Sequence, residues 1–186
     1  MVKKSKKFLI RYSWSQKILS VALSLLLPFG SLTPSFALPR GGAVTHGGAS
    51  LSYSTNKLLI NQHTSAASFS WTSFNVKSGQ SVQYVTPGSS SVSMNFIGGT
   101  TPSSIEGSVT SNGILYFMNP NGLIFGSGSV VSAAGVMAFG SATPWGKPTG
   151  SVSNGGTMMA QPGGTVALVG TNVSNTVSSK NGRSGA

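Results

Sequence analysis

Residues 112–126 read Asn-Gly-Ile-Leu-Tyr-Phe-Met-Asn-Pro-Asn-Gly-Leu-Ile-Phe-Gly. Two short apolar runs, Ile114–Met118 and Leu123–Phe125, are joined by Asn119-Pro120-Asn121-Gly122. Proline presets φ for the second position of a tight turn, and the Asn and Gly that follow it tolerate positive φ. The segment therefore predicts a strand, a turn and a second strand. Locally, this pattern is equally typical of an ordinary turn between core strands, so a functional role needs support from the rest of the chain.

The first of these strands is apolar on both sides. Ile114, Tyr116 and Met118 fall on one face, and Leu115 and Phe117 fall on the other. A strand that is buried on one side only should alternate between polar and apolar residues. We therefore expect both faces of this strand to be covered, by a cap, a second layer or a partner.

Further short strands with turn signals between them extend in both directions, so the chain is predicted to be all-β. A sandwich, a barrel or a solenoid is compatible with the pattern. Short segments, turns rich in Asn and Gly, and the absence of helical periodicity favour a parallel β-helix. We expect irregular structure over 38–48 and a looser chain from Ser141 onward. The expected strands are 50–54, 58–62, 67–71 running into 73–76, 81–85, 92–97, 105–109, 114–118, 123–125, 129–131, 135–139, 150–152 and 165–169.

The composition leaves little for catalysis. The 186 residues include no cysteine and a single acidic residue, Glu106, so paired-carboxylate chemistry and disulfides are excluded. Neither His46 nor His63 has neighbours that would complete a metal site, which takes three or four convergent ligands. We predict that the chain is not an enzyme and has no catalytic residue, cofactor or metal site.

The formal net charge of +11 does not indicate nucleic-acid binding, because the basic residues are not clustered on the body of the chain. Half of the twelve Lys and Arg residues lie within the first 17 positions, and the others are scattered singly. We predict no nucleic-acid partner.

Residues 1–37 have the parts of a signal peptide in order. A basic region ends at Lys17, an apolar run covers 18–27, and Ser35-Phe36-Ala37 supplies small residues before the expected cleavage after Ala37. The apolar run is shorter than the about 20 residues that span a bilayer. The leader therefore predicts export by the Sec machinery. At the other end, 178–186 form a polar tail that we expect to be disordered.

Four segments together resemble the two-partner secretion domain found at the N-terminus of filamentous haemagglutinin-type exoproteins. The resemblance covers roughly residues 38–177. Its motifs, in the order of the family, are Phe69–Val76, then Asn95–Gly99 with Pro102–Gly107, then Asn112-Gly113 with Asn119–Gly126 after the hydrophobic strand, then Gly163–Gly170.

The resemblance implies a right-handed, single-stranded parallel β-helix with an N-terminal β cap. It also implies recognition by an outer-membrane transporter through periplasmic POTRA domains, release to the medium or cell surface through the periplasm, and nucleation of β-helix folding. The domain is expected to be incomplete at its C-terminal end, and the parent is expected to be an adhesin, haemagglutinin or contact-dependent toxin. No small-molecule substrate is implied.

The residues that carry these expectations fall into two groups. Asn119, Pro120, Asn121 and Gly122 are the candidate transporter-recognition or folding motif. The candidate structural positions of the family motifs are Trp71, Phe74, Asn75, Asn95, Gly98 and Gly99. Two alternatives compete with this interpretation: a short self-standing surface adhesin, and a carbohydrate-active β-helix enzyme, which the missing carboxylates disfavour.

Overall fold

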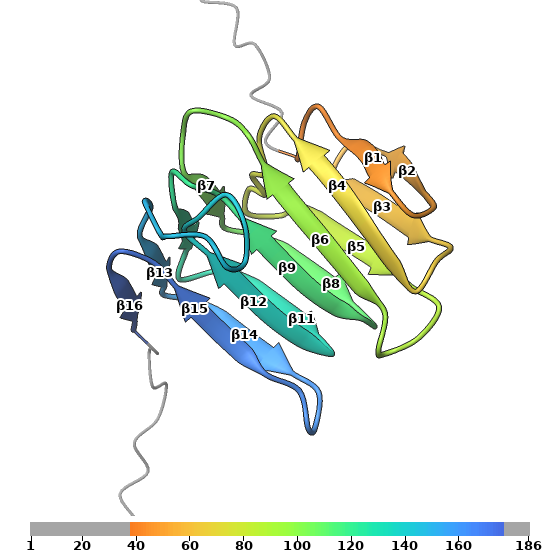
Figure 1. Cartoon of the computed structure of the whole chain (residues 1–186). Helices are drawn as coiled ribbons and strands as arrows, with labels where there is room; N and C mark the ends of the chain where they lie inside the picture. Colours follow the sequence, from red (N-terminus) through yellow and green to blue (C-terminus); the bar gives the residue numbers. More distant parts are fainter. Residues whose placement is uncertain (1–37, 177–186) are drawn as a thin grey trace, which may run out of the picture. The chain divides into compact units, whose positions relative to one another are not determined.

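The computed structural model describes residues 38–176, which wind into a β-solenoid of three sheets with no helix (Figure 1). Every complete turn contributes one strand to each sheet. Sheet I contains β1 (Ala43–His46), β4 (Ala66–Trp71), β6 (Val92–Ile97), β9 (Ile114–Met118), β12 (Gly135–Phe139) and β15 (Val166–Val169). Sheet II contains β7 (Ser103–Ile105), β10 (Leu123–Phe125), β13 (Val152–Asn154) and β16 (Val173–Asn175). Sheet III contains β2 (Ala49–Tyr53), β3 (Lys57–Gln62), β5 (Ser81–Val85), β8 (Ser108–Ser111), β11 (Val130–Ala133) and β14 (Thr157–Ala160).

Successive turns stack in parallel register. In sheet I, Met94 pairs with Tyr116 and Tyr116 pairs with Met137, so equivalent positions of consecutive turns form columns. Because side chains alternate along each strand, one set of columns fills the interior and the other faces outward. The predicted parallel β-helix is confirmed.

The N-terminal end is closed by antiparallel pairing. Strand β1 pairs antiparallel with β4, and β2 pairs antiparallel with β3. Leu38 is buried in the interior cluster, and Thr72 N donates to Arg40 O at 2.9 Å. The predicted β cap is therefore confirmed, whereas the expectation of irregular structure over 38–48 is wrong. Strand β1 was not predicted, because glycine residues flank it on both sides and it pairs only with β4, which is distant in the sequence.

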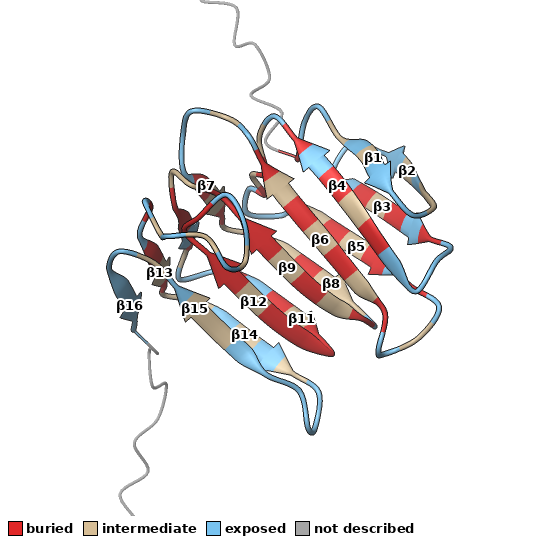
Figure 2. Cartoon of the chain, viewed as in Figure 1, coloured by how far each residue is buried: buried red, intermediate tan, exposed pale blue. Residues whose placement is uncertain are grey.

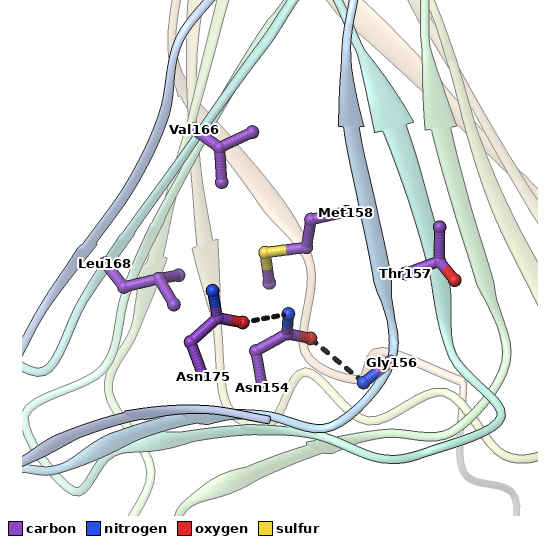
Figure 3. A pocket seen from close by; sticks show the side chains of 7 residues that line it. All are labelled: Asn154, Gly156, Thr157, Met158, Val166, Leu168 and Asn175. Carbon is purple, nitrogen blue, oxygen red and sulfur yellow. Dashed lines mark hydrogen bonds between the residues drawn. The ribbon is translucent and has the colours of Figure 1, made fainter. Parts of the chain in front are cut away.

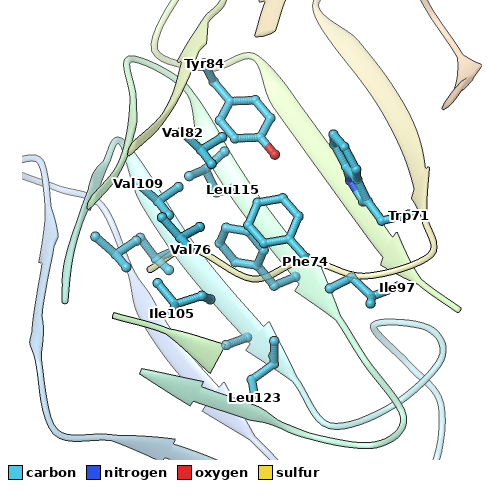
Figure 4. Packing of buried hydrophobic residues seen from close by; sticks show 14 of the residues in the cluster. Trp71, Phe74, Val76, Val82, Tyr84, Ile97, Ile105, Val109, Leu115 and Leu123 are labelled. Atoms are coloured by element: carbon cyan, nitrogen blue, oxygen red, sulfur yellow. The ribbon is translucent and has the colours of Figure 1, made fainter. Parts of the chain in front are cut away.

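The interior is packed with aromatic residues near the cap and with aliphatic residues further on (Figure 4). Trp71 and Phe74 lie edge to face with ring centroids 5.4 Å apart, and Phe74 and Phe117 follow at 5.2 Å. All three rings are fully buried. This aromatic column joins the first turn to the third, and it accounts for Trp71 and Phe74 as core positions.

Two predicted strands are interrupted in the structure. The expected strand over 105–109 is two strands on different sheets, because Glu106 N and Gly107 N both donate to Val76 O, at 2.7 and 3.0 Å. Similarly, the chain leaves sheet I after Trp71, and Val76 makes only an isolated bridge to Ile105. In both places the run of apolar residues passes from one sheet of the solenoid to the next, so the sequence does not show where one strand ends.

The expected loosening after Ser141 is only partly correct. A loop does follow β12, but β13, β14, β15 and β16 then complete further rungs. Strand β13 begins two residues later than predicted, at Val152. The strands β14 and β16 were not predicted, because they are short, lack a regular alternation of apolar and polar residues, and are held by pairing with β11 and β13.

The two-sided apolar strand is covered completely on its inner face and partly on its outer face. Leu115 and Phe117 point into the core and are fully buried. Ile114 and Tyr116 point outward and are partly exposed. Met118, also on the outer side, is fully buried. The expectation that both faces are covered therefore holds for the inner face and for Met118, and only in part for Ile114 and Tyr116.

The predicted signal peptide, its cleavage after Ala37 and the tail 178–186 lie outside the described residues. Within 38–176, the structure contains no helix long and apolar enough to cross a membrane.

Candidate functional site: the Asn119–Gly122 corner

The Asn-Pro-Asn-Gly segment forms the corner where the chain passes from β9 in sheet I to β10 in sheet II. Asn119 Oδ1 accepts from Asn121 N at 2.9 Å, and Gly122 N donates to Asn119 O at 2.9 Å. Gly122 has a φ of +110°, and a Cβ at this position would lie 2.6 Å from Ser151 O. A side chain at Gly122 would therefore meet both an unfavourable backbone conformation and the backbone of the next turn.

Side chains of the corner bind the preceding turn. Asn119 Nδ2 donates to Thr101 O at 3.2 Å and to Ser103 Oγ at 3.0 Å. Asn121 Nδ2 donates to Gly99 O at 2.6 Å. The structure thus brings together two family motifs that are separate in sequence, Gly98-Gly99 and Asn119–Gly122.

The Gly98-Gly99 pair is in turn fitted against the first turn. Gly98 N donates to Trp71 O at 2.9 Å. A Cβ at Gly99 would collide with the carbonyl oxygen of Thr72. The close approach of these two backbones explains why glycine occupies this position.

The following turn closes the corner from the other side. Asn119 N donates to Phe139 O at 3.0 Å, Leu123 N donates to Ser151 O at 3.0 Å, and Thr149 Oγ1 donates to Pro120 O at 2.8 Å. Asn119 itself has no exposed surface, whereas Pro120 and Asn121 are partly exposed. Every polar atom of the Asn119 side chain is engaged within the protein, so this side chain acts on the fold and offers nothing to an external partner.

A second asparagine, Asn95, organises the aromatic core from inside β6. Its Oδ1 accepts from Trp71 Nε1 at 3.0 Å and from Tyr84 Oη at 2.6 Å, and its Nδ2 donates to Tyr116 O at 3.0 Å. Asn95, Trp71 and Tyr84 are buried, and burial raises the pKa of the Tyr84 hydroxyl well above its ordinary value. One amide therefore joins three consecutive turns and satisfies polar groups that would otherwise be costly to bury.

Asn75 holds a different corner. Its Oδ1 accepts from Ser104 N at 2.7 Å, which positions β7 at the start of sheet II. The predicted motif residues are thus divided among two corners and the core, and they do not form a single cluster. Sequence reasoning missed Ser103, Tyr84 and Thr149, the partners of Asn119, Asn95 and Pro120, because ordinary Ser, Thr and Tyr residues carry no signal of a partner many residues away.

A hollow lies at the last described turn (Figure 3). Its volume is about 360 Å³, and Met158, Leu168 and Val166 project into it. Asn154 Nδ2 donates to Asn175 Oδ1 at 2.9 Å along its floor. Within 38–176, no three His, Asp or Glu side chains gather as metal ligands would. The hollow is the interior of the solenoid exposed at its end.

Comparison with known proteins agrees with this geometry. A family model described as the TPS secretion domain matches residues 35–185. A heme/hemopexin-binding protein of Haemophilus influenzae is 34% identical over 124 residues, which is 66% of this chain and 14% of that protein. A second heme/hemopexin-binding protein of the same species is 32% identical over 107 residues, which is 57% of this chain and 11% of that protein.

The fold also matches a solved structure. The HMW1 secretion domain of Haemophilus influenzae aligns with a TM-score of 0.63 and 23% sequence identity, covering 74% of this chain and 40% of that one. This likeness supports the solenoid fold. The family match covers most of the sequence, including both the Asn119–Gly122 corner and the asparagine-centred core. The chain therefore belongs to the TPS secretion domain family, whose members are non-catalytic modules of two-partner secretion.

Proposed function

We propose that this chain is the secretion and recognition module of a Gram-negative exoprotein and directs export through a cognate outer-membrane transporter of the two-partner type. The observation that carries the proposal is the capped solenoid of residues 38–176 in a chain that belongs to the TPS family. Exoproteins of this family are secreted or surface-exposed in Gram-negative bacteria. The signal peptide predicted for 1–37 supports a route through the Sec machinery and the periplasm.

The parent protein is proposed to be an adhesin, a haemagglutinin or a contact-dependent toxin. The chain spans only about one seventh of the length of one heme/hemopexin-binding relative, at 14%. The relatives are named for heme and hemopexin binding, which widens the class of proteins that such a module serves.

A second part of the proposal concerns folding. Val166 and Val173, which point toward the hollow end, are 42% and 49% exposed, and Met158 and Leu168 are only partly buried. Another turn in parallel register would cover these side chains and pair with the free edges of β14, β15 and β16. The capped N-terminal end and the open last turn support folding that starts at the cap and proceeds turn by turn.

The Asn119–Gly122 corner is proposed to serve export through folding. Its hydrogen bonds reach the turn before it and the turn after it, so the corner fixes the stacking of three turns. The burial of Asn119 argues against direct contact with the transporter.

The double variant Asn119→Ala, Asn121→Ala tests this role in cells that express the cognate transporter. We expect loss of release together with loss of folding, measured by circular dichroism of the purified chain. Asn56→Ala is the matched control, because Asn56 is exposed and engages only through its backbone carbonyl. Loss of release in a variant that folds normally would instead assign the corner to recognition.

Dependence on the transporter tests the function itself. Release of the wild-type chain should require the transporter gene. Equal release or surface retention without that gene would contradict the proposal and favour a self-standing adhesin.

A further inference from the structure

The corner where the chain passes from sheet III to sheet I differs in length from one turn to the next. Two consecutive turns use only one or two residues there: 112–113 between β8 and β9, and Ala134 between β11 and β12. The turns before and after them use six residues, 86–91, and five residues, 161–165. Figure 1 shows these two longer loops projecting on either side of the short corners, and Figure 2 shows that both are largely exposed at their tips. The two loops are therefore the walls of a depression in this edge of the solenoid.

Two hollows lie along this edge, one on each side of the short corners. The first, of about 240 Å³, is lined by both walls and by Ile114 and Ala134 between them. The second, of about 350 Å³, lies against β5, β8 and β11, and Gln161 borders both hollows. Since the walls are three strand spacings apart, roughly 14 Å, the hollows together form a groove with the size of a small-ligand site. We call it the corner groove and define it by its side chains: Gln83, Ser89, Thr110, Ile114, Ser132 and Gln161.

The first wall of the corner groove is fixed to the short corner beside it. Asn112 Oδ1 accepts from Thr86 N at 2.7 Å, and Asn112 Nδ2 donates to Thr86 O at 2.8 Å. At the other end of the same loop, Ile114 N donates to Ser91 O at 2.7 Å. The Asn112 side chain therefore holds the wall in place and is not itself free to bind a ligand.

The second wall is fixed through its backbone. Gln161 N donates to Ala133 O at 3.0 Å, and Gly164 N donates to Gln161 O at 2.8 Å. A Cβ at Gly164 would collide with Ala134 O, so this wall lies directly against the neighbouring turn. Both walls are thus held by the fold itself. The corner groove exists before a ligand arrives, which reduces the ordering cost of binding.

The polar side chains of the corner groove are not used by the fold. Gln83, Thr110 and Ser132 stand in register on β5, β8 and β11, and Gln161 follows at the second wall. Within residues 38–176, these four side chains make no hydrogen bond to the protein. Hydroxyl and amide groups both donate and accept, so the row can bind a ligand that does the same.

Charge and polarity narrow the class of ligand. Among the described residues, no charged side chain lines either hollow, which disfavours nucleic acid and anionic sugars. Peptides are usually bound by a free strand edge or by apolar and charged pockets, and the corner groove offers neither. A sugar ring combines hydroxyl groups on its rim with apolar C–H faces. The free hydroxyl and amide groups match the rim, and Ile114, Pro162 and the 41% exposed Val85 offer apolar contact to the faces.

We propose that the corner groove binds an uncharged oligosaccharide, which lies across the corner with sugar units in both hollows. The ligand is bound and not cleaved, because no carboxylate lines the groove among the described residues. This inference goes beyond the proposed function and does not depend on the transporter.

The test is a nuclear magnetic resonance titration of the purified, isotope-labelled mature chain. The probes are four uncharged tetrasaccharides, built from glucose, galactose, mannose or N-acetylglucosamine units. We expect at least one of them to shift the amide signals of Gln83, Ser132 and Gln161. Gln161→Ala should bind that probe about tenfold more weakly, because it removes hydrogen bonds in both hollows. The control Asn56→Ala removes an exposed amide that lines neither hollow and should bind as the wild type does.

A second variant, Gln83→Ala, guards against an indirect effect of the first. Gln83 borders only the second hollow, so the loss should be smaller, about threefold. Both variants should fold as the wild type does by circular dichroism, since neither side chain bonds to the protein within the described residues. No shift with any tetrasaccharide, shifts confined to other regions, or wild-type affinity in Gln161→Ala would each overturn the inference.

Two further probes test the ligand class: a tetrasaccharide of galacturonate, which is anionic, and an uncharged peptide of Gly and Ser. Tighter binding of either one than of every neutral tetrasaccharide would refute the assignment to uncharged sugars. Secretion by cells separates this inference from the proposed function. Gln161→Ala should be released through the transporter as the wild type is, so a failure of sugar binding would leave the proposed function intact.

Discussion

Replacing Asn119 by alanine should cause a large loss of stability for a single change in a corner. The substitution removes four hydrogen bonds: two from Nδ2, to Thr101 O and Ser103 Oγ, and two to Oδ1, from Asn121 N and Nδ2. Each contributes about 1 kcal/mol net, and an unpaired buried group costs about 1–3 kcal/mol. Ser103 is 1% exposed, so its hydroxyl cannot regain water, whereas the partly exposed Asn121 can.

We therefore expect Asn119→Ala to lower the free energy of unfolding by about 3 kcal/mol. This is roughly a hundredfold change in the ratio of folded to unfolded protein. Asn119→Asp places a buried carboxyl group against the Thr101 carbonyl oxygen, so it should cost at least as much as alanine although it keeps the acceptor. Asn56→Ala should stay within about 0.5 kcal/mol of the wild type, as an exposed position does.

Urea unfolding followed by tryptophan fluorescence measures these differences. Trp145 is 91% exposed and Trp71 is 1% exposed, so a Trp145→Phe background leaves Trp71 as the one tryptophan reporter within residues 38–176. An Asn119→Ala midpoint indistinguishable from that of Asn56→Ala, with an unchanged slope, would refute the assignment of the corner as a structural clamp.

Three further changes test other parts of the structure. Gly122→Ala should destabilise the chain by about 2 kcal/mol, because of the positive φ and the close Ser151 carbonyl, and a neutral result in urea unfolding would contradict that geometry. Asn95→Ala should cost about 3 kcal/mol by leaving the Trp71 and Tyr84 donors unpaired, and an unchanged melting temperature would count against the network. Burial raises the Tyr84 pKa above 10.0, so the folded state favours the neutral hydroxyl, and the free energy of unfolding should fall as pH rises above about 10. Tyr84→Phe should make this fall with pH less steep. An equally steep fall in the variant and the wild type would contradict the prediction.

The sequence was most informative where turn residues bound a short run with apolar interior positions. The strands Val92–Ile97 and Gly135–Phe139 have their predicted bounds, because apolar interior positions and turn residues mark both ends. Strand β16 could not be predicted in this way, because Val173–Asn175 is exposed and owes its conformation to pairing with β13. Which residues of β13 it pairs with depends on how many residues each turn of the solenoid contains, and this number varies along the chain.

The candidate motif was located correctly in sequence, but its partners were not evident there. Asn119 appeared as part of a tight turn, and nothing in the local pattern indicated that its amide meets Ser103. Likewise, the outward column of Met94, Tyr116 and Met137 exists only once the register of three turns is known. Both features depend on stacking between turns, which the local alternation does not encode.

The most direct test of the central claim is the amount of chain released into the medium by cells that carry or lack the cognate transporter gene. Quantitative immunoblotting of the medium and the periplasm should show release only when the transporter is present, with mature chain held in the periplasm when it is absent. Equal amounts in the medium of both strains would contradict the assignment of this solenoid as a two-partner secretion module.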